Sequence, residues 1–248
     1  MSAGLVGALC GLIGLLALGV PAGIRALPEP PPEDLPEDPE QDTRLQAMLR
    51  AEGPKELYAD LAARPRLAWW ATAASVVVAA AIGVRLGNHP ATWALALLTP
   101  VLVLLAVVDW RTRLLPRVVV LPATGILILL AGLEWLVQRD THVLVRTLIA
   151  MLVARSFFWI LWFIRSAGMG FGDVRLAALL GLVLGRLGWS EWIIGLYGGL
   201  VLFGVFGITL AIVRRDRATL KKAYPFGPFM IAGALLGVLT SGSVVLLP

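Results

Sequence analysis

The sequence is poor in the residues that build metal and redox centres. Its 248 residues include one cysteine, Cys10, and two histidines, His89 and His142. A single cysteine excludes an internal disulfide, a CxxC redox pair and a cysteine-based zinc site. The HExxH motif of zinc proteases does not occur, and no lysine falls within an apolar segment, where it could serve a serine nucleophile. We therefore expect no bound metal and no cofactor.

Charged residues are also scarce. Only 15% of the residues are charged, 58% are hydrophobic and the mean hydropathy is +0.84, which exceeds the apolar content of soluble domains. A bilayer core about 30 Å thick needs about 20 apolar residues per helix. The sequence predicts an all-α, polytopic membrane helix bundle with about eight transmembrane helices, at residues 4–27, 67–86, 91–108, 118–137, 143–164, 174–187, 192–213 and 225–247.

The basic residues predict the orientation of the bundle, because Lys and Arg favour cytoplasmic loops. With the N-terminus outside, sixteen Lys and Arg residues fall in or beside the inner connections, and only Arg85, Arg139 and Arg186 fall in the outer ones. The net charge of +5 therefore reports orientation in a plasma or inner membrane. Since no basic connection is long enough to fold as a module, we expect membrane lipid and no nucleic acid as a partner.

Acidic residues gather in residues 28–66, which hold ten of the sixteen. We expect an N-terminal transmembrane anchor at 1–27, an acidic, Pro-rich cytosolic loop at 28–66 and a membrane domain at 67–248. The first apolar stretch lacks the basic residues that open a signal peptide, which favours an uncleaved anchor. Residues 28–40 cannot bury a core and are expected to be extended, whereas residues 43–63 favour a helix along the membrane surface.

Only six acids lie outside this loop, and two of them stand apart. Four are expected at the outer face or in a basic loop: Glu134, Asp140, Glu191 and Asp216. Asp109 and Asp173 fall at the inner ends of predicted spans. Asp109 could be an interfacial carboxylate that pairs with Arg111 or Arg113, and Asp173 could be a helix N-cap. Alternatively, both carboxylates belong to a functional site.

The surroundings of Asp173 favour a functional site. Three alternate glycines precede it, Gly168, Gly170 and Gly172; this is more than a cap requires, and glycine lets a substrate or backbone approach closely. The span behind it has fourteen residues and rises about 21 Å, which is short of the bilayer core. Asp173 is then expected below the inner surface, where a carboxylate is costly and marks a functional site by default.

Two carboxylates brought together share one proton, because neighbouring like charges cannot both ionise. One acid and one base are then present at neutral pH. The base can activate a water against a peptide carbonyl, while the acid protonates the oxygen or the leaving amine. This is the chemistry of an aspartic protease, which needs neither a metal nor a nucleophilic side chain.

Three motifs resemble the type IV prepilin peptidases, the GxGD-type membrane aspartic proteases that also include the archaeal preflagellin peptidases. The motifs are Asp109 with Leu115-Pro116, Gly-Met-Gly-Phe-Gly-Asp at 168–173 and Tyr-Pro-Phe-Gly-Pro-Phe at 224–229, and the resemblance covers residues 90–248. It implies a helix bundle with Asp109 and Asp173 as the catalytic pair at the cytosolic face. The residues implied to shape the site are Gly168, Gly170, Gly172, Pro225, Phe226, Gly227 and Pro228. The implied activity is endopeptidase cleavage of the leader from pilin-like precursor proteins.

The sequence also departs from this family. Many members carry a cytosolic zinc domain with paired cysteines that methylates the new N-terminus, whereas residues 28–66 contain no cysteine, so we expect no methyltransferase activity. Arg175 stands where lysine is usual. A presenilin-type protease would carry YD and PAL motifs, which do not occur. Two other functions stay open: a proton- or cation-coupled membrane transporter that uses the two aspartates, and an inactive scaffold for pilus or secretion assembly.

Overall fold

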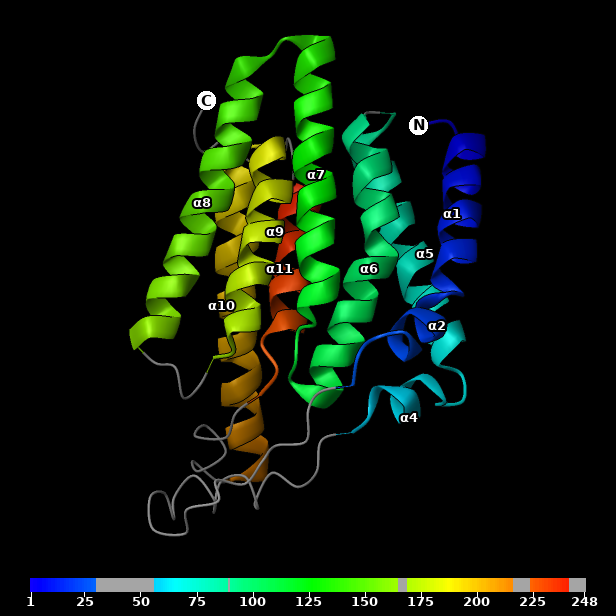
Figure 1. The fold of residues 1–248 in the computed structure, drawn as a ribbon, viewed down its shortest axis with the longest axis vertical. Coiled ribbons are helices and arrows are strands. Elements are labelled where there is room, and N and C mark those ends of the chain that lie inside the picture. The colour runs from blue at the N-terminus through cyan, green and yellow to red at the C-terminus, as the bar shows by residue number, and fades with distance from the viewer. Residues whose placement is uncertain (30–55, 89, 165–168, 216–223, 241–248) are drawn as a thin grey trace.

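Ten helices and no strand make up the described part of the chain. The structure, a computed structural model, describes residues 1–29, 56–88, 90–164, 169–215 and 224–240. Most of the helices run along the long axis of the molecule (Figure 1). In chain order the helices are α1 (Ala3–Ala17), α2 (Val20–Arg25), α4 (Tyr58–Ala62), α5 (Leu67–Leu86), α6 (Pro90–Thr112), α7 (Arg117–Gln138), α8 (Thr141–Ile164), α9 (Phe171–Leu187), α10 (Trp189–Arg214) and α11 (Gly227–Thr240). The predicted all-α bundle is confirmed.

Within the described residues, six apolar stretches are long enough to cross a membrane. They are α1 with α2 taken together, α5, α6, α7, α8 and α10, so the chain is a multi-pass membrane protein. The predicted spans at 174–187 and 225–247 coincide with shorter helices, α9 with 17 residues and α11 with 14. Residues 241–247 of the last predicted span lie outside the described residues.

The predicted acidic loop is described only at its two ends. Residues 30–55 hold nearly all of its Pro-rich stretch and lie outside the described part of the chain. Within the predicted surface helix at 43–63, α4 covers the last described turn. It packs on α2 and α6 at the lower end of the bundle in Figure 1, and three of its five residues are buried. This end of the loop is therefore part of the bundle and does not merely lie along its surface.

Helix α9 forms the centre of the bundle. Twelve of its 17 residues are buried, and α7, α8, α10 and α11 all pack on it. A helix that is apolar on every side requires such enclosure. Its N-terminal end, which carries Asp173, is therefore held inside the protein.

Glycines bring the central helices into close contact. A Cβ atom added at Gly181 of α9 would lie 2.6 Å from the Cβ of Ala154 in α8, and one added at Gly233 of α11 would lie 2.6 Å from the Cα of Gly199 in α10. Small residues at such positions are how membrane helices pack, because lipid supplies no hydrophobic force between them. This packing fixes α9 and α11 relative to their neighbours.

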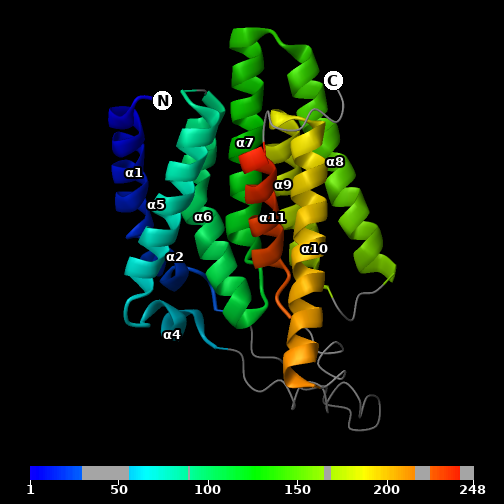
Figure 2. The same cartoon turned by 180° about the vertical axis from the view of Figure 1, so that it is seen from behind.

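The bundle has two halves, one made of α1, α2, α4, α5 and α6 and the other of α7 to α11 (Figure 2). Helix α11 joins them, because it packs on both α6 and α5; α6 also contacts α7. We call the boundary between α5 or α6 and the second half the seam. Asp109 comes from the first half and Asp173 from the second.

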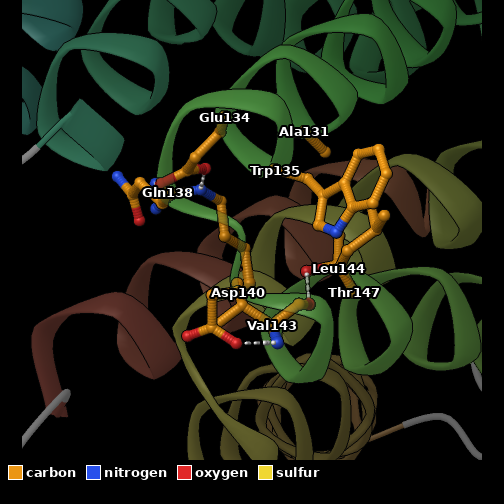
Figure 3. Close-up of a pocket in the computed structure, with 9 residues that line it drawn as sticks. Ala131, Glu134, Trp135, Gln138, Asp140, Val143, Leu144 and Thr147 are labelled. Carbon is orange, nitrogen blue, oxygen red and sulfur yellow. Dashed lines mark hydrogen bonds and ion pairs between the residues drawn. The ribbon is translucent and has the colours of Figure 1, made fainter.

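Charged side chains connect α7, α8 and α9 at the end of the bundle opposite to Asp109 and Asp173. Arg186 Nε donates to Glu134 Oε2 at 2.6 Å. Arg146 donates to the carbonyl oxygens of Gly185 and Arg186 in the last turn of α9, at 2.8 and 3.0 Å, and so caps groups that lack an intrahelical partner. Figure 3 shows Glu134 and Asp140 among the residues that line one pocket at this end; Asp140 Oδ1 accepts the Val143 amide hydrogen at 3.1 Å. These contacts are structural and account for two of the acids that the sequence places at the outer face.

Candidate active site

The C-terminal end of α6 places Asp109 inside the bundle. The residue is 4% exposed, which is at odds with an interfacial carboxylate that reaches into water. Its Oδ2 accepts the backbone N–H of Gly227 at 2.9 Å. Gly227 is the first residue of α11, where backbone N–H groups have no intrahelical acceptor and the helix dipole favours a negative charge. The start of α11 is therefore a built-in partner for this carboxylate.

Glycine is required at position 227 because Asp109 comes so close. A Cβ atom added there would lie 2.8 Å from Asp109 Oδ2 and 3.2 Å from its Cγ. Any side chain at this position would push the carboxylate away from the amide that binds it.

The first turn of α9 places Asp173. The helix begins at Phe171 with Gly170 as its N-cap, so Asp173 lies inside the helix and the N-cap interpretation is wrong. Its carboxylate accepts a hydrogen bond from the backbone of Gly170, as an acid at the third helical position commonly does. The residue is 6% exposed. The hydrogen bond from Gly170 does not use the full capacity of the Asp173 carboxylate, which can therefore also interact with another group.

The two carboxylates lie close enough to interact electrostatically, although 64 positions separate them in the chain. Asp109 also interacts with Arg113, which follows it by one turn. Two buried carboxylates that repel each other are a poor structural element, because one must stay protonated or be neutralised. Such an arrangement is common where acid–base chemistry is performed.

The connection between α6 and α7 packs on the turn that carries Asp173. Leu115 is buried and lies directly on the turn that carries Asp173: a Cβ atom added at Gly172 would be 2.7 Å from the Leu115 Cβ. Pro116 is the N-cap of α7 and ends the connection. Leu115-Pro116 thus sets the spacing between the end of α6 and the start of α9.

Residues 96–213 match the model of the type IV leader peptidase family. This part of the chain is therefore similar to the type IV leader peptidases. The chain is 33% identical to a prepilin leader peptidase/N-methyltransferase of Aeromonas salmonicida over 156 residues. These residues make up 62% of this chain and 51% of the relative. The chain is 30% identical over 173 residues to the protein of the same name from Aeromonas hydrophila, covering 68% and 57% of the two chains.

The chain spans about half the length of the curated relatives it matches. A third relative, the prepilin leader peptidase/N-methyltransferase of Pseudomonas putida, is 29% identical over 153 residues, which is 60% of this chain and 48% of the relative. No solved structure matches the chain.

The residues that the leader peptidase motifs single out have different surroundings. Gly172 and Gly227 are in close contact with the rest of the site, as described above, whereas a Cβ at Gly170 would meet nothing closer than 3.8 Å. Gly168 lies outside the described residues. Arg175 places its guanidinium over the ring of Phe171, 4.8 Å from its centre, which is a cation–π contact.

The Pro-Phe-Gly-Pro turn opens α11 beside a group of aromatic rings. Phe226 is buried and packs on Phe203 and Phe158, with ring centres 5.1 and 5.8 Å apart. Pro228 follows Gly227 in the first turn of α11, and Pro225 precedes the helix. The turn therefore anchors the amide that binds Asp109.

Sequence reasoning missed two residues near this site, Tyr58 and Thr112. Thr112 is 1% exposed; its hydroxyl donates to the Val108 carbonyl at 2.8 Å and accepts the Leu114 amide hydrogen at 3.3 Å. The Tyr58 hydroxyl bonds to the same Thr112 side chain, and burial raises its pKa above the ordinary value. The phenol is thus a neutral donor that holds the end of α6. The one sequence signal for this contact is the presence of an aromatic residue, Tyr58, in a stretch that is predicted to lie on the membrane surface.

Glu29 fixes the helix that carries this tyrosine. Its carboxylate accepts the backbone N–H groups of Tyr58 and Ala59 at 2.9 and 2.8 Å and so caps the start of α4. In the described part of the chain, no group of three or more His, Cys, Asp or Glu residues could hold a metal ion. The expectation that the protein has no metal and no cofactor stays a prediction.

Proposed function

We propose that this protein is a membrane aspartic endopeptidase that removes the leader peptide from type IV pilin-like precursors. The observation that carries the proposal is the pair of buried carboxylates, Asp109 and Asp173, that the fold brings from two halves of the bundle into electrostatic contact. The match of residues 96–213 to the type IV leader peptidase family and the relatives named prepilin leader peptidase/N-methyltransferase support it. Methyl transfer, which the relatives' name also includes, is not part of the proposal.

In the proposed reaction the ionised carboxylate takes a proton from a water molecule, and the water oxygen attacks the carbonyl carbon of the scissile peptide. The protonated carboxyl group donates its proton to the carbonyl oxygen, which gives a tetrahedral intermediate. The C–N bond then breaks as the first carboxyl group protonates the nitrogen, and the second carboxylate takes back a proton from a hydroxyl of the intermediate, which gives the new carboxyl terminus and restores the pair. The Gly227 amide holds one Asp109 oxygen and leaves the other free for water, and burial excludes competing solvent from the pair.

The proposed topology places all eight predicted spans across the membrane, including the shorter α9 and α11, with the N-terminus outside. The end of α6 and the starts of α9 and α11 share the lower end of the bundle in Figure 1. Arg111, Arg113 and Arg117 surround the α6–α7 connection at this end, which favours the cytosolic face of a plasma or inner membrane. A site at this face can receive a leader from water and an apolar segment from lipid.

The test is cleavage of a co-expressed pilin-like precursor, followed by intact mass, with wild type and with Asp109→Asn and Asp173→Asn. Asparagine keeps the size of the side chain but cannot exchange the proton. Asp140→Asn is the matched control, because it changes a helix-capping carboxylate at the other end of the bundle. We expect wild type and the control to remove the leader, and both site variants to accumulate in the membrane without cutting. Normal cleavage by either site variant contradicts the mechanism, and no cleavage by wild type favours the scaffold or transporter function.

A further inference from the structure

An apolar cavity of about 170 Å³ lies in the seam, between α5 and α6 on one side and α9 and α11 on the other. The residues used below that line it are Val78, Thr99, Val103, Leu180, Pro228 and Ala232. Thr99 is the only lining residue with a polar side chain, and its hydroxyl already donates to the Leu95 carbonyl at 3.1 Å. The cavity can therefore bind an apolar group through shape and packing contacts, and its lining side chains provide no partner for a charged group.

The cavity lies on the three helices that also hold the carboxylate pair. Val103 precedes Asp109 by six residues on α6, and Leu180 follows Asp173 by seven on α9, which places both lining residues about 10 Å from the carboxylates at 1.5 Å per residue. On α11, Pro228 is the direct neighbour of Gly227, whose amide binds Asp109. Helices α6 and α9 thus place the cavity lining about 10 Å beyond the carboxylates at 1.5 Å per residue, while α11 carries the lining up to the site itself.

The cavity is also accessible from outside the bundle. Ala232 both lines it and is exposed, and the lining residue Val78 of α5 is half-buried. Figure 2 shows the side on which α11 faces α5 and α6 across the seam. A segment lying in the membrane against this face can therefore insert a side chain without crossing the protein.

We infer that this cavity binds an apolar side chain of the precursor on the membrane side of the scissile bond. The inference rests on the proposed peptidase function. A distance of about 10 Å corresponds to three residues of extended chain or to about seven residues of helix, so the side chain belongs to one of residues three to seven after the cut. A cavity of about 150 Å³ accepts a benzene-sized ligand, which is the size class of one large aliphatic or aromatic side chain.

The selectivity of such a pocket comes from shape and from the exclusion of charge. Lipid is as apolar as the cavity, so moving a side chain from lipid into it gains little from the hydrophobic effect and depends on packing contacts. A charged side chain at the same position would be buried without a partner. The pocket would therefore set the register of the precursor: the apolar segment fits in one position along the seam, and the scissile bond then lies at the carboxylates.

The first test fills the pocket with Ala232→Phe and compares two substrates. One is a precursor with its full apolar segment; the other is a peptide that ends two residues after the cut and spans less than about 7 Å, too short to reach the cavity. The measured quantity is the ratio of kcat/KM for the precursor to kcat/KM for the peptide. We expect Ala232→Phe to lower this ratio at least tenfold through a higher KM for the precursor. Ala73→Phe changes an exposed alanine of α5 that does not line the cavity, and is expected to keep the ratio within twofold of wild type.

An unchanged ratio in Ala232→Phe, or an equal fall in Ala73→Phe, overturns the inference and leaves lipid as the occupant of the cavity.

A second measurement needs no cleavage. In a Cys10→Ser background, Ala232→Cys is oxidised with a catalytically inactive enzyme and precursors that carry one cysteine at successive positions after the cut. Disulfides confined to positions three to seven support the inference, and their absence or even spread contradicts it. If wild type cuts neither substrate, the proposed function fails, while this cross-link still decides whether the cavity binds the precursor.

Discussion

Gly172→Ala tests whether the spacing between the two carboxylates controls activity. The added Cβ atom would lie 2.7 Å from the Leu115 Cβ, whereas carbon atoms in contact prefer about 3.5–4.0 Å. The turn that begins α9 and the α6–α7 connection must therefore separate by about 1 Å. Because Asp173 is the next residue and Asp109 lies at the other end of the connection, this shift changes the distance between the carboxylates.

A displacement of about 1 Å can lower a rate about 100-fold, which corresponds to about 2.7 kcal/mol of transition-state stabilisation. Overpacking of this kind also costs about 1–3 kcal/mol of folding free energy. We therefore expect kcat/KM for precursor cleavage to fall about 100-fold in protein that still folds. The measurement is cleavage by purified enzyme in detergent or lipid, with thermal unfolding of the same samples.

Gly170→Ala is the matched control. Its backbone, with φ −73° and ψ 148°, suits any residue, and the nearest atoms to an added Cβ, the Gly172 nitrogen and Asp173 Oδ2, are 3.8 and 3.9 Å away. We expect this variant to lose less than about fivefold, a loss of roughly 1 kcal/mol. Equal losses at positions 170 and 172, or wild-type cleavage by Gly172→Ala, would refute the reasoning.

Two further predictions concern the supports of the site. Tyr58→Phe and Thr112→Val each remove one side of the hydrogen bond at the end of α6, so each should lower kcat several-fold at unchanged KM, and the double variant should lower it no further. The control is Thr99→Val, which changes another buried threonine of α6 whose hydroxyl donates to the carbonyl one turn back; it should leave kcat unchanged. If the losses in Tyr58→Phe and Thr112→Val add up in the double variant, the two side chains are not coupled and the prediction is wrong. Arg146→Met removes both hydrogen bonds to the end of α9 and should lower the free energy of unfolding by about 1–3 kcal/mol, measured by thermal unfolding in detergent. Arg117→Met, at an exposed position, is its control, and an equal loss there would show that the cap carries no special stability.

Much of the architecture could be predicted from the sequence because a membrane imposes a simple rule: a helix that crosses it needs about 20 apolar residues in a row. This rule places α5, α7 and α8 within a few residues of their ends. The predicted span at 174–187 also matches α9 within three residues, although this helix has only 17 residues and is enclosed by protein. The predicted end of the last span, 241–247, lies outside the described residues. The position of Asp173 at the start of the short segment could still be predicted, since both its glycines and the length deficit are written in the sequence.

The partners of the carboxylates could not be predicted in the same way. Nothing local in the sequence says that the amide of Gly227 faces Asp109, 118 residues earlier, or that Leu115 fills the space that Gly172 leaves. Tyr58 falls in the stretch whose helix-forming composition predicts a surface helix, and only tertiary packing shows that it is 3% exposed. Close approach between distant segments depends on how whole helices pack, and sequence periodicity carries no information about it.

The division of the site between two halves of the bundle explains why glycine is used so heavily around it. A carboxylate pair can share a proton only if its separation is fixed, and here one member ends α6 while the other begins α9. The two helices are held in register by the α6–α7 connection and by α11, which packs on α6 and carries the amide that binds Asp109. Each of these links passes through a glycine with no room for a Cβ atom: Gly172 against Leu115, and Gly227 against Asp109 itself. The glycines therefore set distances between the halves, so a methyl group added at either one should affect catalysis more than it affects folding.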